Sequence, residues 1–475
     1  MTVSFVSFYN LTIMQKQYNN VYLFCITLVA TIGGLLFGYD TAVISGAEKS
    51  IEAYLIIPLG LSSLVHGATV SSALIGCIIG GAISGFISNR LGRKKSLFVA
   101  GILFFTTSLA AAYPEFLFFE KGEPTLGVLF AFNFYRIIGG IGVGMASAIC
   151  PMYIGEIAPA EIRGRLVSCN QFAIIFGMLV VYFVNWGIAS GQSVEWINDL
   201  GWRYMFASEA IPAGIFIILV LFIPETPRYL AMANRHEEAV SVLVKISGSV
   251  EKAEGILSEI KSTITEKTSS SVFSYGKKVI IIGILLSAFQ QFVGINVALY
   301  YAPRIFESMG AAKDASMLQT IVMGLINVVF TVVAIMTVDK WGRKPLLITG
   351  SIGMAIGMFA ISGLAFFDII GISTLVFIII YTASFMMSWG PICWVLIAEI
   401  FPNKIRGQAV AIAVAAQWIA NYLISSTYPP MMEFSSAMTY GFYGTMALIS
   451  ALFVWKTLPE TKGKSLEEME KYWKK

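Results

Sequence analysis

The stretch Asn-Arg-Leu-Gly-Arg-Lys at residues 89–94 recurs 250 positions later as Asp-Lys-Trp-Gly-Arg-Lys at residues 339–344. Two further patterns repeat in the same order: Glu-x6-Arg-Gly from Glu156 and again from Glu399, and Pro-Glu-Thr at 224–226 and again at 459–461. The three offsets are similar, and such regular self-similarity indicates a chain built from two related halves. Any fold assigned to this protein must therefore be divisible into two equivalent units.

Composition indicates what these halves consist of. Of the 475 residues, 57% are hydrophobic and 13% are charged, whereas soluble domains contain about 25% charged residues. A helix that crosses about 30 Å of hydrocarbon needs about 20 apolar residues, and twelve nearly uncharged windows of that kind occur. They are 22–46, 68–88, 96–113, 126–152, 166–189, 203–223, 279–303, 316–338, 345–367, 371–398, 405–427 and 437–457. The sequence predicts an all-α polytopic membrane protein with six transmembrane helices in each half.

The basic residues predict how the helices are oriented. With the N-terminus inside, 26 of the 32 Lys and Arg residues lie in cytoplasmic segments, so both termini should be cytoplasmic. Five lie outside, namely Lys49, Lys121, Arg203, Arg304 and Lys313. The net charge of +4 is too small to indicate a nucleic-acid partner. The predicted organisation is a cytoplasmic N-terminal segment at 1–21, a first half at 22–223, a cytoplasmic linker with short amphipathic helices at 224–278, a second half at 279–457 and a cytoplasmic tail at 458–475.

The set of motifs resembles the sugar porter family of the major facilitator superfamily. Besides the repeated loops, the resemblance rests on Gln-Gln-Phe-Val-Gly-Ile-Asn at 290–296 and Ser-Trp-Gly-Pro-Ile-Cys-Trp at 388–394. It covers nearly the whole chain and is most specific to the proton-coupled xylose carriers of the family. It implies the major facilitator fold and symport of a monosaccharide with protons by alternating access, D-xylose being the implied sugar. It also implies a monomer in the bacterial inner membrane that is driven by the proton gradient without a cofactor.

Two charged residues inside the predicted spans are candidates for proton coupling. Asp40 is the only charge in the first span, and Arg136 lies in the fourth. A charge at the centre of a bilayer costs about 2.5–3.5 kcal/mol on insertion scales, so we expect the two to pair. A permanent ion pair that only orients two helices is the alternative to a switch in which Asp40 takes up and releases a proton. The resemblance implies the switch, since passive glucose facilitators have an uncharged residue in place of the aspartate.

Side chains suited to a sugar are concentrated in the second half. Amides hydrogen-bond sugar hydroxyls, and aromatic rings cover the C–H face of the sugar. Gln290 and Asn296 share a face only if the helix breaks near Gly294, as transporter helices do at their binding sites. Taken singly, an amide is equally explained by a bond between helices worth about 0.6 kcal/mol. Together with the resemblance, these residues predict a sugar site formed by Phe37, Gln171, Gln290, Gln291, Asn296, Tyr300, Asn327, Phe385, Gly390, Trp394, Gln417 and Trp418.

One position departs from the xylose carriers. Met178 follows Gln171 by two helical turns, and those carriers have a glutamine there. The identity of the sugar therefore stays open. A passive monosaccharide facilitator and a hexose–proton symporter are the alternatives to D-xylose–proton symport.

Acidic and basic residues recur at matching cytoplasmic span ends in both halves. Charges that only set the topology are the ordinary explanation. Their recurrence in pairs favours a salt-bridge network between the halves that closes a cytoplasmic gate in the outward-facing state, as the resemblance also implies. Exposed pairs contribute about 0–1 kcal/mol each, which suits a latch that opens in every cycle. The predicted gate residues are Arg93, Glu156, Arg163, Glu225, Arg228, Arg343, Glu399 and Arg406.

Several other functions are not indicated. The five cysteines form no Cys-x-x-Cys or His/Cys cluster, so neither a metal site nor a disulfide framework is predicted. The two histidines, His66 and His236, are expected in loops. The glycines at 139–144 lack the spacing of a nucleotide loop and, with those at 76–85, fit close helix packing instead. Without a Walker motif, or a nucleophile–base pair in the spans, neither an ATP-driven pump nor an enzyme is predicted.

Overall fold

The computed structural model describes residues 18–462, except 117, 160–161, 266–271, 309, 311, 370 and 403–404, together with residues 469, 472 and 473. The predicted N-terminal segment before residue 18, part of the Ser/Thr-rich linker and most of the predicted tail lie outside these residues. In the described part, twelve helical segments are long and apolar enough to cross a membrane, from Asn20–Ile56 to Ser436–Thr457. The predicted polytopic all-α fold is confirmed.

The helices divide into two sets of transmembrane segments with a short helical group between them. The first set is α2 (Asn20–Ile51), α3 (Ser63–Val70), α4 (Ser72–Leu91), α5 (Arg93–Ala112), α6 (Leu126–Ile157), α7 (Arg163–Ala189), α8 (Val194–Trp196), α9 (Trp202–Ser208) and α10 (Ala210–Val220). The group between is α11 (Pro227–Met232), α12 (His236–Ser247) and α13 (Val250–Thr265). The second set is α14 (Lys277–Phe292), α15 (Ile295–Tyr300), α16 (Ala302–Ser308), α17 (Lys313–Trp341), α18 (Arg343–Phe366), α19 (Ile372–Met387), α20 (Trp389–Ile400), α21 (Arg406–Phe434) and α22 (Ser436–Thr457).

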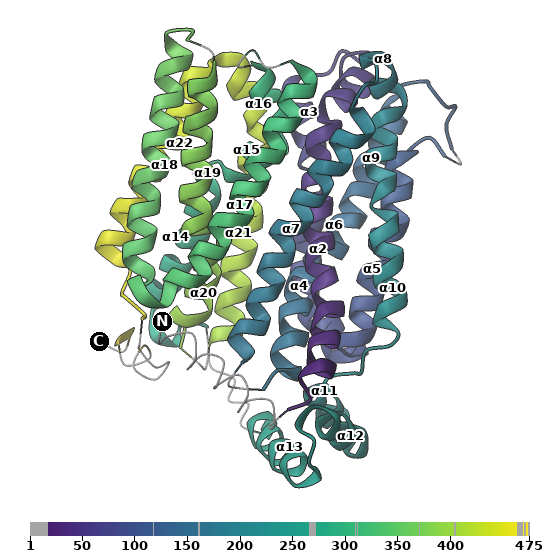
Figure 1. Cartoon of the computed structure of the whole chain (residues 1–475), viewed down its shortest axis with the longest axis vertical. Helices are drawn as coiled ribbons and strands as arrows, with labels where there is room; N and C mark the ends of the chain where they lie inside the picture. Colours follow the sequence, from purple (N-terminus) through teal and green to yellow (C-terminus); the bar gives the residue numbers. More distant parts are fainter. Residues whose placement is uncertain are drawn as a thin grey trace, which may run out of the picture.

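The two sets stand side by side as parallel bundles (Figure 1). Helices α11–α13 gather at one end of the molecule, which we call the linker end, and α3 and α16 lie at the opposite end, the far end (Figure 1). Helix α12 buries Ala239, Leu243 and Ile246 while Glu237 and Glu238 face solvent. This amphipathic pattern is the one that the sequence predicts for the linker.

Contacts between the halves come from five helix pairs. Helix α7 packs on α17, helix α21 packs on α3 and α4, and the short helices α15 and α16 pack on α2. The pairing of α7 with the second half includes a hydrogen bond of 3.4 Å from the hydroxyl of Tyr182 to the carbonyl oxygen of Leu299. Residues from both halves are thus brought together along one central interface.

Three polar residues lie elsewhere than the sequence predicts. His66 was expected in a loop, but it lies in α3 and is fully buried, because the helix begins at Ser63, ahead of the apolar window that starts at residue 68. Arg203 was assigned to an outside loop, yet it is fully buried in α9 and pairs with Glu115 at 2.7 Å. The other histidine, His236, also lies in a helix, as the first residue of α12.

Glycines allow α4 and α6 to approach closely. A Cβ atom on Gly140 would lie 1.9 Å from the carbonyl oxygen of Ala73, and one on Gly76 would lie 1.9 Å from the carbonyl oxygen of Ile137. Real carbon and oxygen atoms cannot come so near, so the two backbones occupy the space that side chains would need. The predicted role in helix packing is confirmed for Gly76, Gly80, Gly140 and Gly144. It is wrong for Gly81 and Gly85, where a Cβ atom would meet no atom within 4 Å.

We expect Gly140→Ala to lower the melting temperature of the detergent-solubilised protein, because the added methyl group forces α4 away from α6 at a cost of about 1–3 kcal/mol. Thermal unfolding followed by size-exclusion chromatography measures the effect. Gly85→Ala on α4 is the matched control, since its new Cβ would meet no atom within 4 Å, and it should leave stability unchanged or slightly raised. Equal melting temperatures for the two variants would contradict this packing argument.

Candidate functional site

A buried ion pair joins α2 and α6. An Nη atom of Arg136 lies 2.6 Å from a carboxylate oxygen of Asp40, and the two side chains are 5% and 7% exposed. The guanidinium carbon of Arg136 also lies 5.3 Å from the centre of the Phe206 ring. The expected pairing of Asp40 with Arg136 is therefore confirmed in geometry.

A third charged residue belongs to this cluster, and the sequence analysis missed it. Glu209 connects α9 to α10 and is 1% exposed. Its carboxyl group interacts with Asp40 and with Arg136, and its Oε1 has no hydrogen-bond partner in the described part of the chain. The sequence does contain a signal for Glu209, because it is an acidic residue inside the apolar window 203–223. The same reasoning identifies Asp40. The cluster thus combines two carboxyl groups with one guanidinium group.

The predicted break in the seventh span is present. Helix α14 ends at Phe292, Gly294 has a φ of +90°, and α15 starts at Ile295. This left-handed conformation favours glycine. The break turns Asn296 back toward the amides of α14, so that its Nδ2 donates to Oε1 of Gln291 at 2.5 Å.

A chain of amides runs from this break across the second half. Nε2 of Gln291 donates to Oε1 of Gln290 at 3.2 Å, and Gln417 on α21 donates to the same oxygen. Nε2 of Gln290 in turn donates to the carbonyl oxygen of Trp389 at 2.9 Å and to that of Gly390 at 3.3 Å. Four of the predicted sugar-binding amides are therefore directly connected.

Aromatic residues from the two halves meet at their interface. The rings of Phe37 on α2 and Trp418 on α21 have centroids 5.7 Å apart. The hydroxyl of Tyr300 accepts a hydrogen bond from Asn421 at 3.3 Å. Phe385 and Gly390 lie on either side of Ser388, where α19 gives way to α20. Two of the predicted aromatic residues, Phe37 and Trp418, thus meet across the interface between the halves.

Several buried polar atoms in this region have no hydrogen-bond partner within the described residues. They are Oδ1 of Asn327, Oε1 of Gln417 and Nε1 of Trp418. A buried donor or acceptor left unpaired costs about 1–3 kcal/mol. Gln171 and Trp394 are half-buried, and Met178 is 7% exposed on α7.

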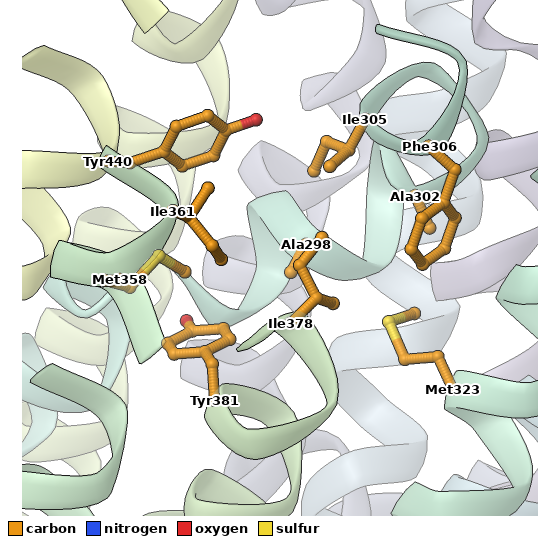
Figure 2. A pocket seen from close by; sticks show the side chains of 10 residues that line it. All are labelled: Ala298, Ala302, Ile305, Phe306, Met323, Met358, Ile361, Ile378, Tyr381 and Tyr440. Carbon is orange, nitrogen blue, oxygen red and sulfur yellow. The ribbon is translucent and has the colours of Figure 1, made fainter. Parts of the chain in front are cut away.

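A separate apolar cavity lies wholly within the second half. Figure 2 shows the residues that line this cavity, among them Ala298, Ala302, Met323, Met358 and Tyr381. Its volume is about 10 Å³, which is room for about one water molecule. Because ligand pockets measure about 300–1,000 Å³, this cavity is a packing feature rather than the sugar site.

At the linker end, each half contains an equivalent set of ionic contacts. Arg93 pairs with Glu156 at 2.9 Å, and Arg343 pairs with Glu399 at 3.0 Å. Glu225 accepts from the backbone N–H of Arg93 at 3.0 Å, and Glu460 accepts from that of Arg343 at the same distance. These contacts join residues of the same half or its adjoining segment.

The other predicted gate residues lie near these pairs. Arg163 and Arg406 each donate to a backbone carbonyl five residues earlier, those of Ala158 and Phe401, and Arg228 is exposed on α11. The salt-bridge network between the halves stays a prediction for a state in which the linker end is closed.

At the far end, ion pairs do cross between the halves. Lys49 of α2 pairs with Glu307 of α16. Arg304 of α16 pairs with Glu48 at 2.9 Å and also with Glu52. The sequence analysis counted Lys49 and Arg304 only as markers of orientation, because nothing in their spacing shows that α2 and α16 meet. In this conformation the far end is the end that ionic contacts hold closed.

Several known proteins resemble this chain in sequence. The profile of the family described as "Sugar (and other) transporter" matches residues 26–473. The chain is 53% identical to the D-xylose-proton symporter of Escherichia coli K12 over 97% of both chains, and 39% identical to the glucose facilitated diffusion protein of Zymomonas mobilis over 94% of this chain and 97% of that protein.

A solved structure with a similar fold is also known. The inward open conformation of the E. coli xylose transporter XylE matches with a TM-score of 0.86 and 52% identity over 95% of this chain and all of that chain. These relatives are transporters and not enzymes. With the matched profile and the twelve spans, they establish that this chain is a multi-pass membrane protein that belongs to the sugar transporter family of the major facilitator fold.

Proposed function

We propose that this protein is a secondary active symporter that carries a monosaccharide, D-xylose, into the cell together with protons by alternating access. We place it in the bacterial inner membrane with the linker end and both termini cytoplasmic, acting as a monomer with the proton gradient as its only driving force. The observation that carries the proposal is the cluster of Asp40, Glu209 and Arg136 beside a buried set of sugar-compatible amides.

The charge ratio of this cluster supports proton binding. Two carboxylates and one guanidinium leave a net negative charge when all three groups are ionised, and burial in a span makes a net charge costly. One proton on the carboxyl pair removes that charge. As the environment of Asp40 changes between the two ends of the membrane, the proton can be loaded on one side and released on the other.

The position of Asp40 links its charge state to the sugar site. Phe37 precedes Asp40 by three residues on α2, so the two side chains lie close to one helix face, and the Phe37 ring packs on Trp418 of the other half. Gly38 lies between them where α2 touches the backbone of α7 near Ile174. A change in the charge of Asp40 that shifts α2 therefore also moves Phe37, one of the residues that we assign to sugar binding.

The substrate assignment rests on the amide network and on relatedness. Gln171, Gln290, Gln291, Asn296 and Gln417, with Asn327, supply donors and acceptors for hydroxyl groups, while Phe37, Tyr300, Phe385, Trp394 and Trp418, beside Gly390, supply the apolar faces. The high identity to a D-xylose-proton symporter supports D-xylose. The glucose facilitator among the relatives keeps passive transport and hexose transport as alternatives, and the buried Asp40 favours coupling to protons.

The energy of one proton is adequate. One charge that moves through 100 mV gains about 2.3 kcal/mol, and about 1.4 kcal/mol corresponds to a factor of ten. One proton per sugar therefore supports roughly a fifty-fold accumulation before any pH difference is added.

Charged residues at both ends are proposed to act in alternation. The pairs Lys49–Glu307 and Arg304–Glu48 hold the far end closed in the inward-facing state. In the outward-facing state Arg93, Glu156, Arg163, Glu225, Arg228, Arg343, Glu399 and Arg406 are brought together across the linker end. The pair Lys49–Glu307 is partly exposed, with side chains 39% and 26% exposed, so it contributes about 0–1 kcal/mol and does not lock the carrier.

We expect Asp40→Asn to abolish proton-driven accumulation of D-xylose in proteoliposomes while it leaves exchange of labelled for unlabelled sugar measurable. The amide keeps the size of the carboxylate but cannot be ionised, so the proton no longer changes the charge of the cluster. Glu238→Gln on α12 is the matched control, because Glu238 is an exposed carboxylate paired only with the nearby Arg235. Accumulation that survives Asp40→Asn would show that Asp40 is not the coupling residue.

The identity of the sugar is tested by competition. We expect unlabelled D-xylose to displace radiolabelled D-xylose from the reconstituted protein more effectively than glucose, arabinose or other pentoses and hexoses. If a hexose displaces xylose better and is itself accumulated with protons, D-xylose is the wrong substrate, and Met178→Gln is the first variant to examine because Met178 lies at the departing position of the site.

A further inference from the structure

Three potential metal ligands lie together at the far end, within the first half. Glu48 is on α2, Glu52 is on the π-helical turn Glu52–Ile56 that continues it, and His66 is on α3. One ligand atom from each residue lies within 4.8 Å of the others. His66 is fully buried and Glu48 is 1% exposed, so the cluster is a built part of the protein and not a chance grouping of surface side chains.

The hydrogen bonding of His66 fixes how its ring faces the carboxylates. Its Nε2 lies 3.2 Å from the backbone carbonyl oxygen of Glu48 and 3.4 Å from Oε2 of the same residue. Both oxygens accept, so Nε2 carries the proton. The other nitrogen, Nδ1, then presents a lone pair 3.7 Å from a carboxylate oxygen of Glu52. Metal-bound histidines are commonly held in this way, with the second ring N–H on a backbone carbonyl.

Among the three side chains of the cluster, only the Nε2–H group of His66 is a hydrogen-bond donor. Neither Nδ1 of His66 nor Oε2 of Glu48 has a hydrogen-bond partner within the described residues. Two carboxylates and an imidazole lone pair, with this single N–H among them, carry an excess of negative charge that favours a cation. In this conformation the cation is the guanidinium group of Arg304, which pairs with Glu48 and Glu52.

Arg304 belongs to the other half. Its helix, α16, packs through Ala302, Ile305 and Phe306 against the second-half lining seen in Figure 2, with Met323 of α17 beside Phe306. The guanidinium should therefore move with the second half, whereas Glu48, Glu52 and His66 stay together on the first. A cavity of about 250 Å³ beside Glu52 and Arg304 provides space next to the cluster.

We propose that Glu48, Glu52 and His66 form a binding site for a divalent cation of the zinc class, which becomes available when the far end opens and Arg304 withdraws. Zinc accepts one imidazole nitrogen and carboxylate oxygens and commonly takes a water as its fourth ligand. Calcium and magnesium prefer six or more oxygen ligands, so the histidine selects against them. A bound ion prevents the return of Arg304 and holds the carrier outward-facing. The conformational part of this inference rests on the proposed alternating access and orientation, but the ligand set does not.

Binding is tested on the purified full-length protein by equilibrium dialysis against ZnCl₂. We expect Arg304→Gln to bind zinc at least about tenfold more tightly than the unmodified protein, because the competing guanidinium is gone. His66→Gln and Glu52→Gln should each weaken binding by about 10–100-fold. The matched control is His236→Gln, which removes the only other histidine and should leave the affinity unchanged.

Zinc that binds His66→Gln as tightly as it binds the unmodified protein overturns the site. Should Arg304→Gln fail to fold, as judged by size-exclusion chromatography, the ligand variants His66→Gln and Glu52→Gln decide the outcome. This measurement needs no transport, so a failure of the proposed sugar symport is distinguishable from a failure of the metal site.

The functional consequence is tested on sugar uptake by intact cells or right-side-out vesicles. External ZnCl₂ should inhibit uptake by the unmodified protein, EDTA should restore it, and CaCl₂ at the same concentration should have no effect. His66→Gln should be about tenfold less sensitive to zinc. Equal sensitivity of the two proteins would overturn the proposal that zinc acts at this cluster.

Discussion

The cost of placing charge in hydrocarbon is the constraint on which the rest of this structure depends. A lone charge in a span costs about 2.5–3.5 kcal/mol or more, and each buried charge described above has a partner on another element. Arg136 meets Asp40 between α2 and α6. Arg203 of α9 meets Glu115, which lies in the connection after α5. Because these partners lie far apart in sequence, the pairs fix which helices must be neighbours.

The internal repeat explains why each half behaves as a unit. Arg93–Glu156 and Arg343–Glu399 are equivalent pairs, and a threonine hydroxyl donates to each glutamate at 2.6 Å, from Thr226 in the first half and from Thr461 in the second. Such contacts tie the ends of several helices together within a half. In the proposed transport cycle, movement is then concentrated at the interface between the halves.

Much of the architecture is predictable from sequence because it depends on local properties. Apolar length predicts the twelve spans, the position of Gly294 predicts the helix break, and scarcity of charge identifies Asp40 and Arg136. The failures have one physical cause, which is that burial of a polar group depends on partners from elsewhere in the chain. The burial of Glu209 is explained only by its interaction with Asp40 on α2, and that of His66 by the nearby carboxylates of Glu48 and Glu52.

Two clusters in this protein share one charge ratio, with two carboxylates for each guanidinium. Asp40 and Glu209 share Arg136 inside the spans, and Glu48 and Glu52 share Arg304 at the far end. Each cluster has one negative charge in excess, but their surroundings differ. The first is enclosed by apolar helices and offers no imidazole, so a proton is the cation that suits it. The second has His66 and an adjoining cavity, and it loses its guanidinium whenever the halves part there. The same electrostatic demand is therefore met by a proton in one place and, in our proposal, by a divalent ion in the other.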